Sequence, residues 1–267
     1  MKKLIPIVSL FFFTSLCSVA SEVGDRAIPA DVTQLSDSLK RQYAPDKRVA
    51  LFDVDYSFSG KNVMLRGVTT SAAAKAALLD GLLKANYKVM DCLQVLPDEA
   101  VLEGKTYGII NVSVSNLRVD PDFSSEMMTQ GLMGMPVRVL QRDGWYRIQT
   151  PDNYIAWVHR VGVHPVTKEE LHAWNAAKIV VTSHYGFVYS EPNQSSQTIS
   201  DVTAGNRLKW EGTKGAFYKV TYPDGRTGYI SKSISMPEKK WRAALKQDAA
   251  SIIHTAHTLM GIPYLWA

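Results

Sequence analysis

The sequence has little of what marks a membrane, disulfide-rich or nucleic-acid-binding protein. Its 267 residues contain two cysteines, too few for a structural zinc site built on thiolates. The formal net charge of +5 is small, and no run of like charge marks a basic surface, so we expect no nucleic-acid partner. Hydrophobic residues make up 46% and charged residues 21%, which excludes a wholly disordered chain.

Residues 1–20 have the pattern of a targeting signal. Two lysines precede an apolar stretch over residues 4–16, and Ser18 and Ala20 place small residues before a cleavage point. The stretch is shorter than the roughly 20 apolar residues that a membrane-spanning helix needs. We therefore expect a cleaved signal peptide, a secreted or periplasmic protein, and no transmembrane segment.

The two cysteines fall on either side of that cleavage point. An alternative makes Cys17 a lipid-anchored N-terminus, although Leu16 stands where lipoprotein signals usually carry a small residue. Cleavage after Ala20 would remove Cys17, and we then expect no internal disulfide in the mature chain. Cys92 lies in a segment that alternates like a strand, and we interpret it as a buried, inert thiol.

Residues 31–105 predict a small α+β domain with the order ββαβ. The expected elements are a helix over 34–43, strands over 52–58, 63–69 and 87–95, and a helix over 71–85. The last helix should turn Ala76, Leu79, Leu82 and Leu83 toward the core.

The middle of the chain contains an internal repeat, in which residues 116–134 resemble residues 187–205 at an offset of 71. After a slip of one residue the similarity resumes at an offset of 72. Matched pairs include Pro121 with Pro192, Gly134 with Gly205, Trp145 with Phe217, and Trp157 with Tyr229. Two copies are too few for a solenoid, so each copy should be a domain with its own core.

Each copy predicts a small β-barrel, because short alternating strands are separated by turns and no helical period interrupts them. We place the barrels over residues 106–166 and 178–236, joined by a short helix within 167–177. The four aromatic residues at matched positions are interpreted as barrel core: Trp145, Trp157, Phe217 and Tyr229.

After the second barrel, apolar residues recur with helical spacing from Pro237 to Leu259, which predicts one amphipathic helix. An apolar helix face must pack against another layer. One interpretation is that the helix packs back onto the second barrel. The other is that residues 237–267 begin a domain cut after its first helix, in which case the face is exposed and promotes self-association.

Two bacterial SH3-like (SH3b) barrels, a helix and the ending GIPYLWA resemble the start of an NlpC/p60 cysteine peptidase domain. That family has a papain-like fold with the motif Tyr-x-Trp-Gly-Gly, followed by Asp-Cys-Ser-Gly. Tyr264 and Trp266 match the first part, and Ala267 stands where a glycine is usual. This order of two barrels, a helix and the motif, over residues 107–267, is similar to that of γ-D-glutamyl-L-diamino acid endopeptidases, also called dipeptidyl-peptidase VI-like enzymes. Those enzymes cleave cell-wall stem peptides after L-Ala-γ-D-Glu.

The resemblance implies that the nucleophilic cysteine and its histidine lie beyond Ala267, so the chain as given is expected to be inactive, with no catalytic residue, metal or cofactor. It also implies that the partners are peptidoglycan stem peptides with a free N-terminal L-Ala. The residues carried over as substrate-binding are Glu126, Tyr264 and Trp266. Glu126 lies in a long loop of the first barrel, where its carboxylate would pair the substrate ammonium. The plainer interpretation is a solvated loop carboxylate.

Other chemistry is poorly supported. Asp91 and Cys92 lack the Ser-Gly that would complete the peptidase motif. His254 and His257 are one helical turn apart without a clear third ligand, so surface histidines are expected. The expected fold is therefore mainly β with α+β, and the alternative function is a non-catalytic SH3b module that binds cell wall or protein.

Overall fold

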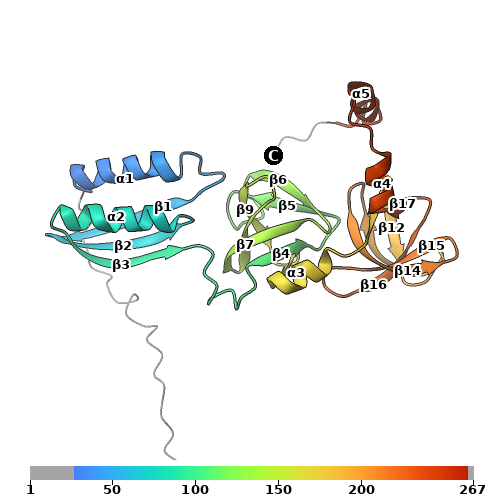
Figure 1. The fold of residues 1–267 in the computed structure, drawn as a ribbon, viewed down its shortest axis with the longest axis horizontal. Helices are drawn as coiled ribbons and strands as arrows, with labels where there is room; N and C mark the ends of the chain where they lie inside the picture. Colours follow the sequence, from blue (N-terminus) through green and yellow to red (C-terminus); the bar gives the residue numbers. More distant parts are fainter. Residues whose placement is uncertain (1–26, 264–267) are drawn as a thin grey trace, which may run out of the picture. The chain divides into compact units, whose positions relative to one another are not determined.

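The computed structural model describes residues 27–263. The expected signal peptide over residues 1–20 and the aromatic pair Tyr264 and Trp266 lie outside the described residues. Two compact units are present (Figure 1). The first contains described residues up to Pro45 and Ala50–Val95, and the second contains Asp46–Val49 and the residues from Leu96 onward.

The first unit is a three-stranded sheet covered on one face by two helices (Figure 1). Its elements are α1 (Ala30–Tyr43), β1 (Phe52–Ser59), β2 (Asn62–Thr69), α2 (Ala72–Lys84) and β3 (Lys88–Val95). Strands β1 and β2 form an antiparallel hairpin, and β2 and β3 pair in parallel. A parallel pair needs a crossover, which α2 provides. The ββαβ order is confirmed, with α1 preceding it.

The apolar face of α2 differs from the expected one. Ala74, Leu78 and Leu82 are fully buried, whereas Leu83 is 60% exposed and Ala76 is also exposed. The buried residues recur at i, i+4 and i+8, so the core stripe is narrower than the expected face. The start of the helix is confirmed, because the Ser71 hydroxyl accepts a hydrogen bond from the Ala74 amide at 3.1 Å.

The prediction of a buried lone thiol at Cys92 is wrong. Cys92 lies in β3, is half-buried and is recorded as disulfide-bonded. The expectation rested on removal of Cys17, the other cysteine of the chain, which lies outside the described residues. Neighbouring Asp91 forms an ion pair with Lys75 at 2.8 Å, so the Asp91–Cys92 pair belongs to a strand and not to the start of a catalytic helix.

The second unit contains two seven-stranded antiparallel sheets with the same topology. Barrel 1 consists of β4 (Tyr107–Ile110), β5 (Val114–Arg118), β6 (Met127–Leu132), β7 (Pro136–Asp143), β8 (Trp145–Gln149), β9 (Ile155–His159) and β10 (Val163–Val166). Barrel 2 consists of β11 (Lys178–Val181), β12 (Gly186–Tyr189), β13 (Thr198–Val202), β14 (Arg207–Lys214), β15 (Phe217–Thr221), β16 (Thr227–Ser231) and β17 (Ser235–Pro237). The strand order β10-β4-β7-β8-β9-β5-β6 becomes β17-β11-β14-β15-β16-β12-β13 in barrel 2, which confirms the repeat.

The repeat extends to irregularities of the strands. The β5–β6 pair shifts register after Leu117, and the β12–β13 pair shifts after Val188, 71 residues later. The one-residue change in repeat offset lies in the hairpin turn between β7 and β8 of barrel 1 and between β14 and β15 of barrel 2. Asp143 pairs with Trp145 around a single glycine, whereas Lys214 pairs with Phe217 around Gly215 and Ala216. One extra turn residue changes the offset from 71 to 72 without disturbing the sheet.

The expectation that the repeated aromatics fill the barrel cores is correct for one residue in each barrel. Trp157 and Phe217 are 8% exposed, whereas Trp145 and Tyr229 are only half-buried. Most other core residues are aliphatic, such as the fully buried Ile148 and Ile230, and barrel 2 adds the buried ring of Tyr222.

The barrels contact one another through a segment of barrel 1 that enters the core of barrel 2. Met133 is 1% exposed and packs in the barrel 2 core, and its carbonyl accepts a hydrogen bond from the Arg207 amide at 2.9 Å. Helix α3 (Lys168–Trp174) confirms the expected connecting helix, and its Trp174 indole donates to the Gly134 carbonyl at 3.4 Å. At the rim, the Ser113 hydroxyl donates to Asp201 at 2.7 Å.

The predicted single C-terminal helix is wrong, because two helices occur: α4 (Glu238–Ala244) and α5 (Ala249–His257). Leu245 is extended, and the Asp248 carboxylate accepts a hydrogen bond from the Ser251 amide at 2.8 Å, which starts a new helix. No residue of α5 is buried. The exposed large apolar residues in this region are Leu245, Ile252, Ile253, Leu259, Met260 and Ile262. The expectation of an exposed apolar face is therefore confirmed for the described residues.

Replacement of Gly134 by alanine should destabilise the barrel pair. Gly134 has φ +84°, and a Cβ there would overlap the carbonyl oxygen of Arg207 in barrel 2. Gly144→Ala is the matched control, because Gly144 has φ +66° and no atom within 4 Å of an added Cβ. We expect G134A to lower the free energy of unfolding by about 2 kcal/mol more than G144A, measured by urea unfolding. Equal losses would contradict a close backbone contact.

The exposed face of α5 should make this chain self-associate at high concentration. Ile252 and Ile253 are 62% and 56% exposed, and burial of apolar surface between copies is favourable. Replacing Ile253 with glutamate should shift the weight-average mass in sedimentation equilibrium toward the monomer. Leu83→Glu is the control, since Leu83 is equally exposed at 60% but lies on α2. A strictly monomeric native chain would contradict the expectation.

Candidate functional site

An aromatic cluster lies on the surface of barrel 1. Phe123, in the loop between β5 and β6, is 67% exposed although it is large and apolar. Its ring centroid lies 4.8 Å from that of Trp145 and 5.0 Å from that of His159, and the latter two rings are 5.1 Å apart. The three residues come from the loop, the start of β8 and the end of β9. Three rings in mutual contact at a surface form a platform suited to an apolar or planar ligand group.

The loop over residues 119–126 holds Phe123 and Glu126 and is ordered by its own hydrogen bonds. The Val119 amide donates to the Glu126 carbonyl at 3.0 Å, and the Asp120 amide donates to the Ser125 hydroxyl at 2.9 Å. Arg118 also donates to the Ser125 carbonyl. The Val119–Glu126 bond closes the base of the loop, and the Asp120–Ser125 bond crosses its interior. These bonds constrain the backbone that carries Phe123 and Glu126.

Asp122 forms the centre of this loop. Its Oδ1 accepts hydrogen bonds from the amide and hydroxyl of Ser124, at 2.7 and 2.6 Å. These bonds, the hydroxyl bond first, favour the ionised form and lower the pKa of the Asp122 carboxyl, with a smaller contribution from the charge of Arg118.

Barrel 2 forms the same loop with different side chains. The Ser190 amide donates to the Gln197 carbonyl at 2.8 Å, and the Glu191 amide donates to the Ser196 hydroxyl at 3.2 Å. Asn193 replaces Asp122, and its Oδ1 accepts from the Ser195 amide at 3.0 Å. Each bond matches its barrel 1 counterpart at an offset of 71. The loop backbone is therefore a property of the repeat.

The side chains that could recognise a ligand are specific to barrel 1. At the repeat positions of Phe123, Glu126, Trp145 and His159, barrel 2 has Gln194, Gln197, Phe217 and Ser231. Barrel 2 thus has uncharged polar side chains at the positions of Phe123, Glu126 and His159. Its own aromatic contacts involve other positions and run from the 60% exposed Tyr185 through Phe187 and Tyr189 to the buried Phe217. The loop of barrel 2 keeps one exposed carboxylate, Glu191, at the repeat position of Asp120, so the contrast is confined to the positions of Phe123, Glu126 and His159.

Of the expected site residues, the structure places only Glu126. Its side chain is exposed, and no hydrogen bond or ion pair of its carboxylate occurs in the described part of the chain. Tyr264 and Trp266 lie outside that part. The sequence analysis missed Phe123 and His159. The repeat alignment contains a signal for these two residues, because Phe123 aligns with Gln194 and His159 aligns with Ser231 in the second copy.

The described residues offer little other chemistry. Within residues 27–263, no group of three His, Cys, Asp or Glu side chains could hold a metal ion. His254 and His257 are both exposed on α5. None of the described helices is long and apolar enough to span a bilayer.

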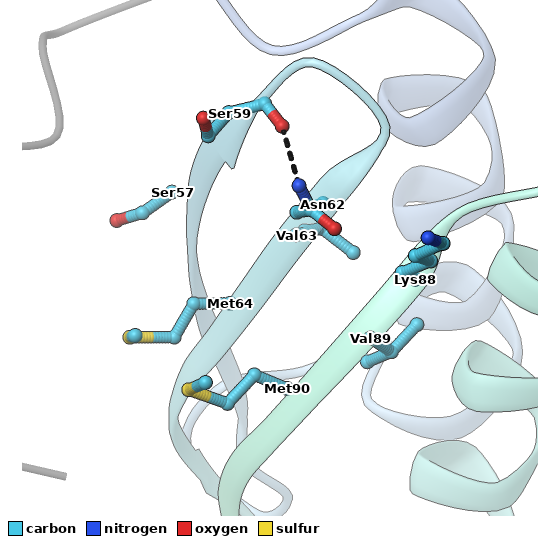
Figure 2. A pocket seen from close by; sticks show the side chains of 8 residues that line it. All are labelled: Ser57, Ser59, Asn62, Val63, Met64, Lys88, Val89 and Met90. Carbon is cyan, nitrogen blue, oxygen red and sulfur yellow. Dashed lines mark hydrogen bonds between the residues drawn. The ribbon is translucent and has the colours of Figure 1, made fainter.

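A hollow of about 300 Å³ lies on the sheet of the first unit. Met64 and Met90 point to the same side of β2 and β3, and the Asn62 amide nitrogen donates to the Ser59 carbonyl at 3.1 Å beside them (Figure 2). Lys88 is the only charged residue among those that line the hollow. Without a carboxylate or histidine in its wall, the hollow offers no acid–base pair.

Titration should reveal the contribution of Asp122 to the loop. Because its pKa is lowered in the folded state, its stabilisation of the loop is present above the unfolded pKa and is lost as pH falls through the folded pKa. We expect the Ser124 amide resonance in NMR spectra to shift with a midpoint below the ordinary aspartate range. Asp122→Asn should abolish this pH-dependent shift of the Ser124 resonance. The Ser195 amide, which bonds to the non-titrating Asn193, is the internal control and should show no such shift. Persistence of the shift in D122N would refute this assignment.

Comparisons with known proteins agree with the two-barrel architecture. Residues 117–161 match the bacterial dipeptidyl-peptidase Sh3 domain, and residues 184–235 match the bacterial SH3 domain. The γ-D-glutamyl-L-lysine dipeptidyl-peptidase of Bacillus cereus (strain ATCC 10987 / NRS 248) is 23% identical over 153 residues, which cover 54% of this chain and 45% of that protein.

A solved structure has a similar fold over part of the chain. An NlpC/P60 family protein from Bacillus cereus ATCC 10987 has a TM-score of 0.50 and 20% identity, over 60% of this chain and 66% of that chain. An NlpC/P60 endopeptidase from Photobacterium damselae subsp. piscicida has a TM-score of 0.40 and 12% identity, over 80% of this chain and 55% of that chain. The chain spans less than two thirds of each of these relatives. Residues 117–161 and 184–235 are therefore bacterial SH3 domains, the first of the dipeptidyl-peptidase type, in a chain distantly related to γ-D-glutamyl-L-lysine dipeptidyl-peptidase and NlpC/P60 proteins.

Proposed function

We propose that barrel 1 recognises the free amino end of peptidoglycan stem peptides for a γ-D-glutamyl-L-diamino acid endopeptidase of the NlpC/P60 type. The observation that carries the proposal is the contrast between the two copies of one loop. Barrel 1 carries the exposed carboxylate of Glu126 and two rings of an aromatic cluster, Phe123 and His159, at positions where barrel 2 has Gln197, Gln194 and Ser231. The similarity to a dipeptidyl-peptidase, a class that acts from a free N-terminus, supports the same assignment.

The chemistry of the surface suits such a ligand. A peptide that begins with L-Ala presents an ammonium group and a methyl group close together. A carboxylate pairs an ammonium through a charge-assisted hydrogen bond, whereas an acetylated amine loses both the charge and two donors. The rings of Phe123 and Trp145 would cover the methyl group and exclude water from the ion pair. Glu126 therefore acts as the selective group, and the aromatic cluster supplies contact area.

Hydrolysis is assigned to a papain-like domain that uses a cysteine and a histidine. Nucleophilic catalysis by cysteine needs an accessible thiolate beside a base. Cys92, the only cysteine among residues 27–263, lies in β3, and no histidine that could act as its base occurs among residues 27–95. The described residues therefore supply substrate selection and not the nucleophile. Export to the periplasm through the signal peptide over residues 1–20 is part of the same proposal, because stem peptides lie outside the cytoplasm.

A second candidate is a non-catalytic module that binds the cell wall. It is favoured by the contact between the barrels, in which Met133 is buried within barrel 2. Such a contact makes the barrel pair a self-sufficient binding unit. Both candidates use the surface of barrel 1, and they differ in whether a free amine is required.

Peptide binding distinguishes them. We expect the chain to bind L-Ala-γ-D-Glu-L-Lys more tightly than the N-acetylated peptide, measured by NMR titration. Glu126→Gln should weaken binding of the free-amine peptide about fivefold or more and leave the acetylated peptide unchanged. Phe123→Leu should weaken both peptides, since it removes contact area and not charge.

Glu191→Gln is the matched control, because Glu191 lies in the equivalent loop of barrel 2 and is also exposed. Its replacement should have no effect on either peptide. Equal affinity of the native chain for both peptides would refute selection of the free amine and favour the wall-binding module.

A further inference from the structure

A second cavity lies where barrel 2 meets α4 and is separate from the aromatic cluster. Its volume is about 580 Å³, within the range of small-molecule sites. The lining residues come from the end of the α3–β11 link, from β11, β14 and β17, and from α4. They are Asn175, Ala176, Ala177, Lys178, Arg207, Trp210, Pro237, Glu238, Lys239 and Arg242.

The wall of this cavity has an excess of positive charge. It contains four cationic side chains and one carboxylate, that of Glu238. The two oxygens of Glu238 are already engaged. Oε2 accepts from Arg207 at 2.9 Å, and Oε1 accepts from Nε and Nη2 of Arg242 at 2.9 and 2.6 Å. Glu238 therefore holds the two guanidinium groups in place, and no hydrogen bond or ion pair between Glu238 and Lys178 occurs in the described part of the chain.

Lys178 is the buried cation of the cavity. It is 4% exposed, and no ion pair of its ammonium occurs among residues 27–263. Its Nζ donates to the Ala176 carbonyl at 3.2 Å and lies 4.4 Å from the centroid of the Trp174 ring. An ammonium has three donors, and a buried charge without a counter-ion is costly. Arg207 adds a second unmet donor, because its buried Nε has no hydrogen-bond partner.

The electrostatics of Lys178 agree with this description. Burial lowers the pKa of its ammonium to about 8, and the charges of Arg207 and Lys209 lower the pKa further against the opposing effect of Glu238. The positive charge of Lys209 is partly offset by Glu211, 3.2 Å away. A bound anion would favour the charged form and raise this pKa.

We propose that this cavity binds an oxyanion, the carboxylate or phosphate group of a small ligand, through Lys178, Arg207 and Arg242. Planar guanidinium groups match the geometry of both groups, and the lysine ammonium adds a compact charge. Trp210 supplies an apolar wall for the remainder of the ligand, since its own indole N–H is bonded to the Gly212 carbonyl at 2.8 Å. The site belongs to barrel 2 and does not depend on the function proposed for barrel 1.

The test titrates the chain with sulfate and with acetate and follows the amide resonances of Lys178 and Arg207 by NMR. Ionic strength is held at about 0.1 M with chloride, so that general screening does not change during the titration. We expect saturable shifts. Binding of sulfate but not acetate would indicate a phosphate-type ligand, and binding of acetate but not sulfate would indicate a carboxylate-type ligand. Binding of both would indicate a general oxyanion site, and each of these results supports the proposal.

Variants separate the site from surface charge. Lys178→Met should weaken binding about tenfold or more, and Arg242→Gln, which changes a side chain 62% exposed, should weaken it without risk to the fold. Lys214→Met is the control, because Lys214 is exposed on β14 and does not line the cavity. Affinity for sulfate should fall as pH rises through about 8, where Lys178 loses its proton. Non-saturable shifts, or equal weakening by K214M, would overturn the proposal.

Discussion

The close contact of Met133 and Gly134 with Arg207 determines the arrangement of the second unit. Met133 is buried in the core of barrel 2, and its carbonyl accepts the Arg207 amide. Gly134 leaves room for the Arg207 carbonyl because it has no Cβ and adopts φ +84°. Because Met133 of barrel 1 packs in the core of barrel 2, separating the barrels would leave a cavity in that core. The two barrels therefore share a buried contact at Met133.

The repeat separates what the fold requires from what recognition requires. The loops over residues 119–126 and 190–197 have matching hydrogen bonds, so their backbone needs only small polar residues at a few positions. The positions of Phe123 and Glu126 take no part in those side-chain bonds and are free to differ between the copies. Neither the strands nor the hydrogen bonds of the loop impose the differences at such positions. The contrast between the copies thus supports a recognition role for barrel 1.

Sequence patterns predicted the repeated barrels, the connecting helix and the ββαβ unit, because strand alternation and turns are local signals. They failed where tertiary contacts decide. Trp145 is large and apolar like a core residue, yet it lies half-buried at the surface, where its ring contacts Phe123 and His159. The break between α4 and α5 follows from a cap at Asp248 that competes with an unbroken apolar period. Glu126 was identified through a family resemblance, whereas the aromatic cluster depends on ring positions that no spacing rule provides.

Arg207 also links the contact between the barrels to the cationic cavity. Its backbone bonds to barrel 1 through Met133, and its guanidinium bonds to Glu238 at the start of α4. Nη2 of Arg207 is bonded to Glu238 whereas Nε has no partner, so an anion on Nε would lie beside the ion pair that joins α4 to barrel 2. Occupation of the cavity therefore acts on the junction between the barrels and the C-terminal helices.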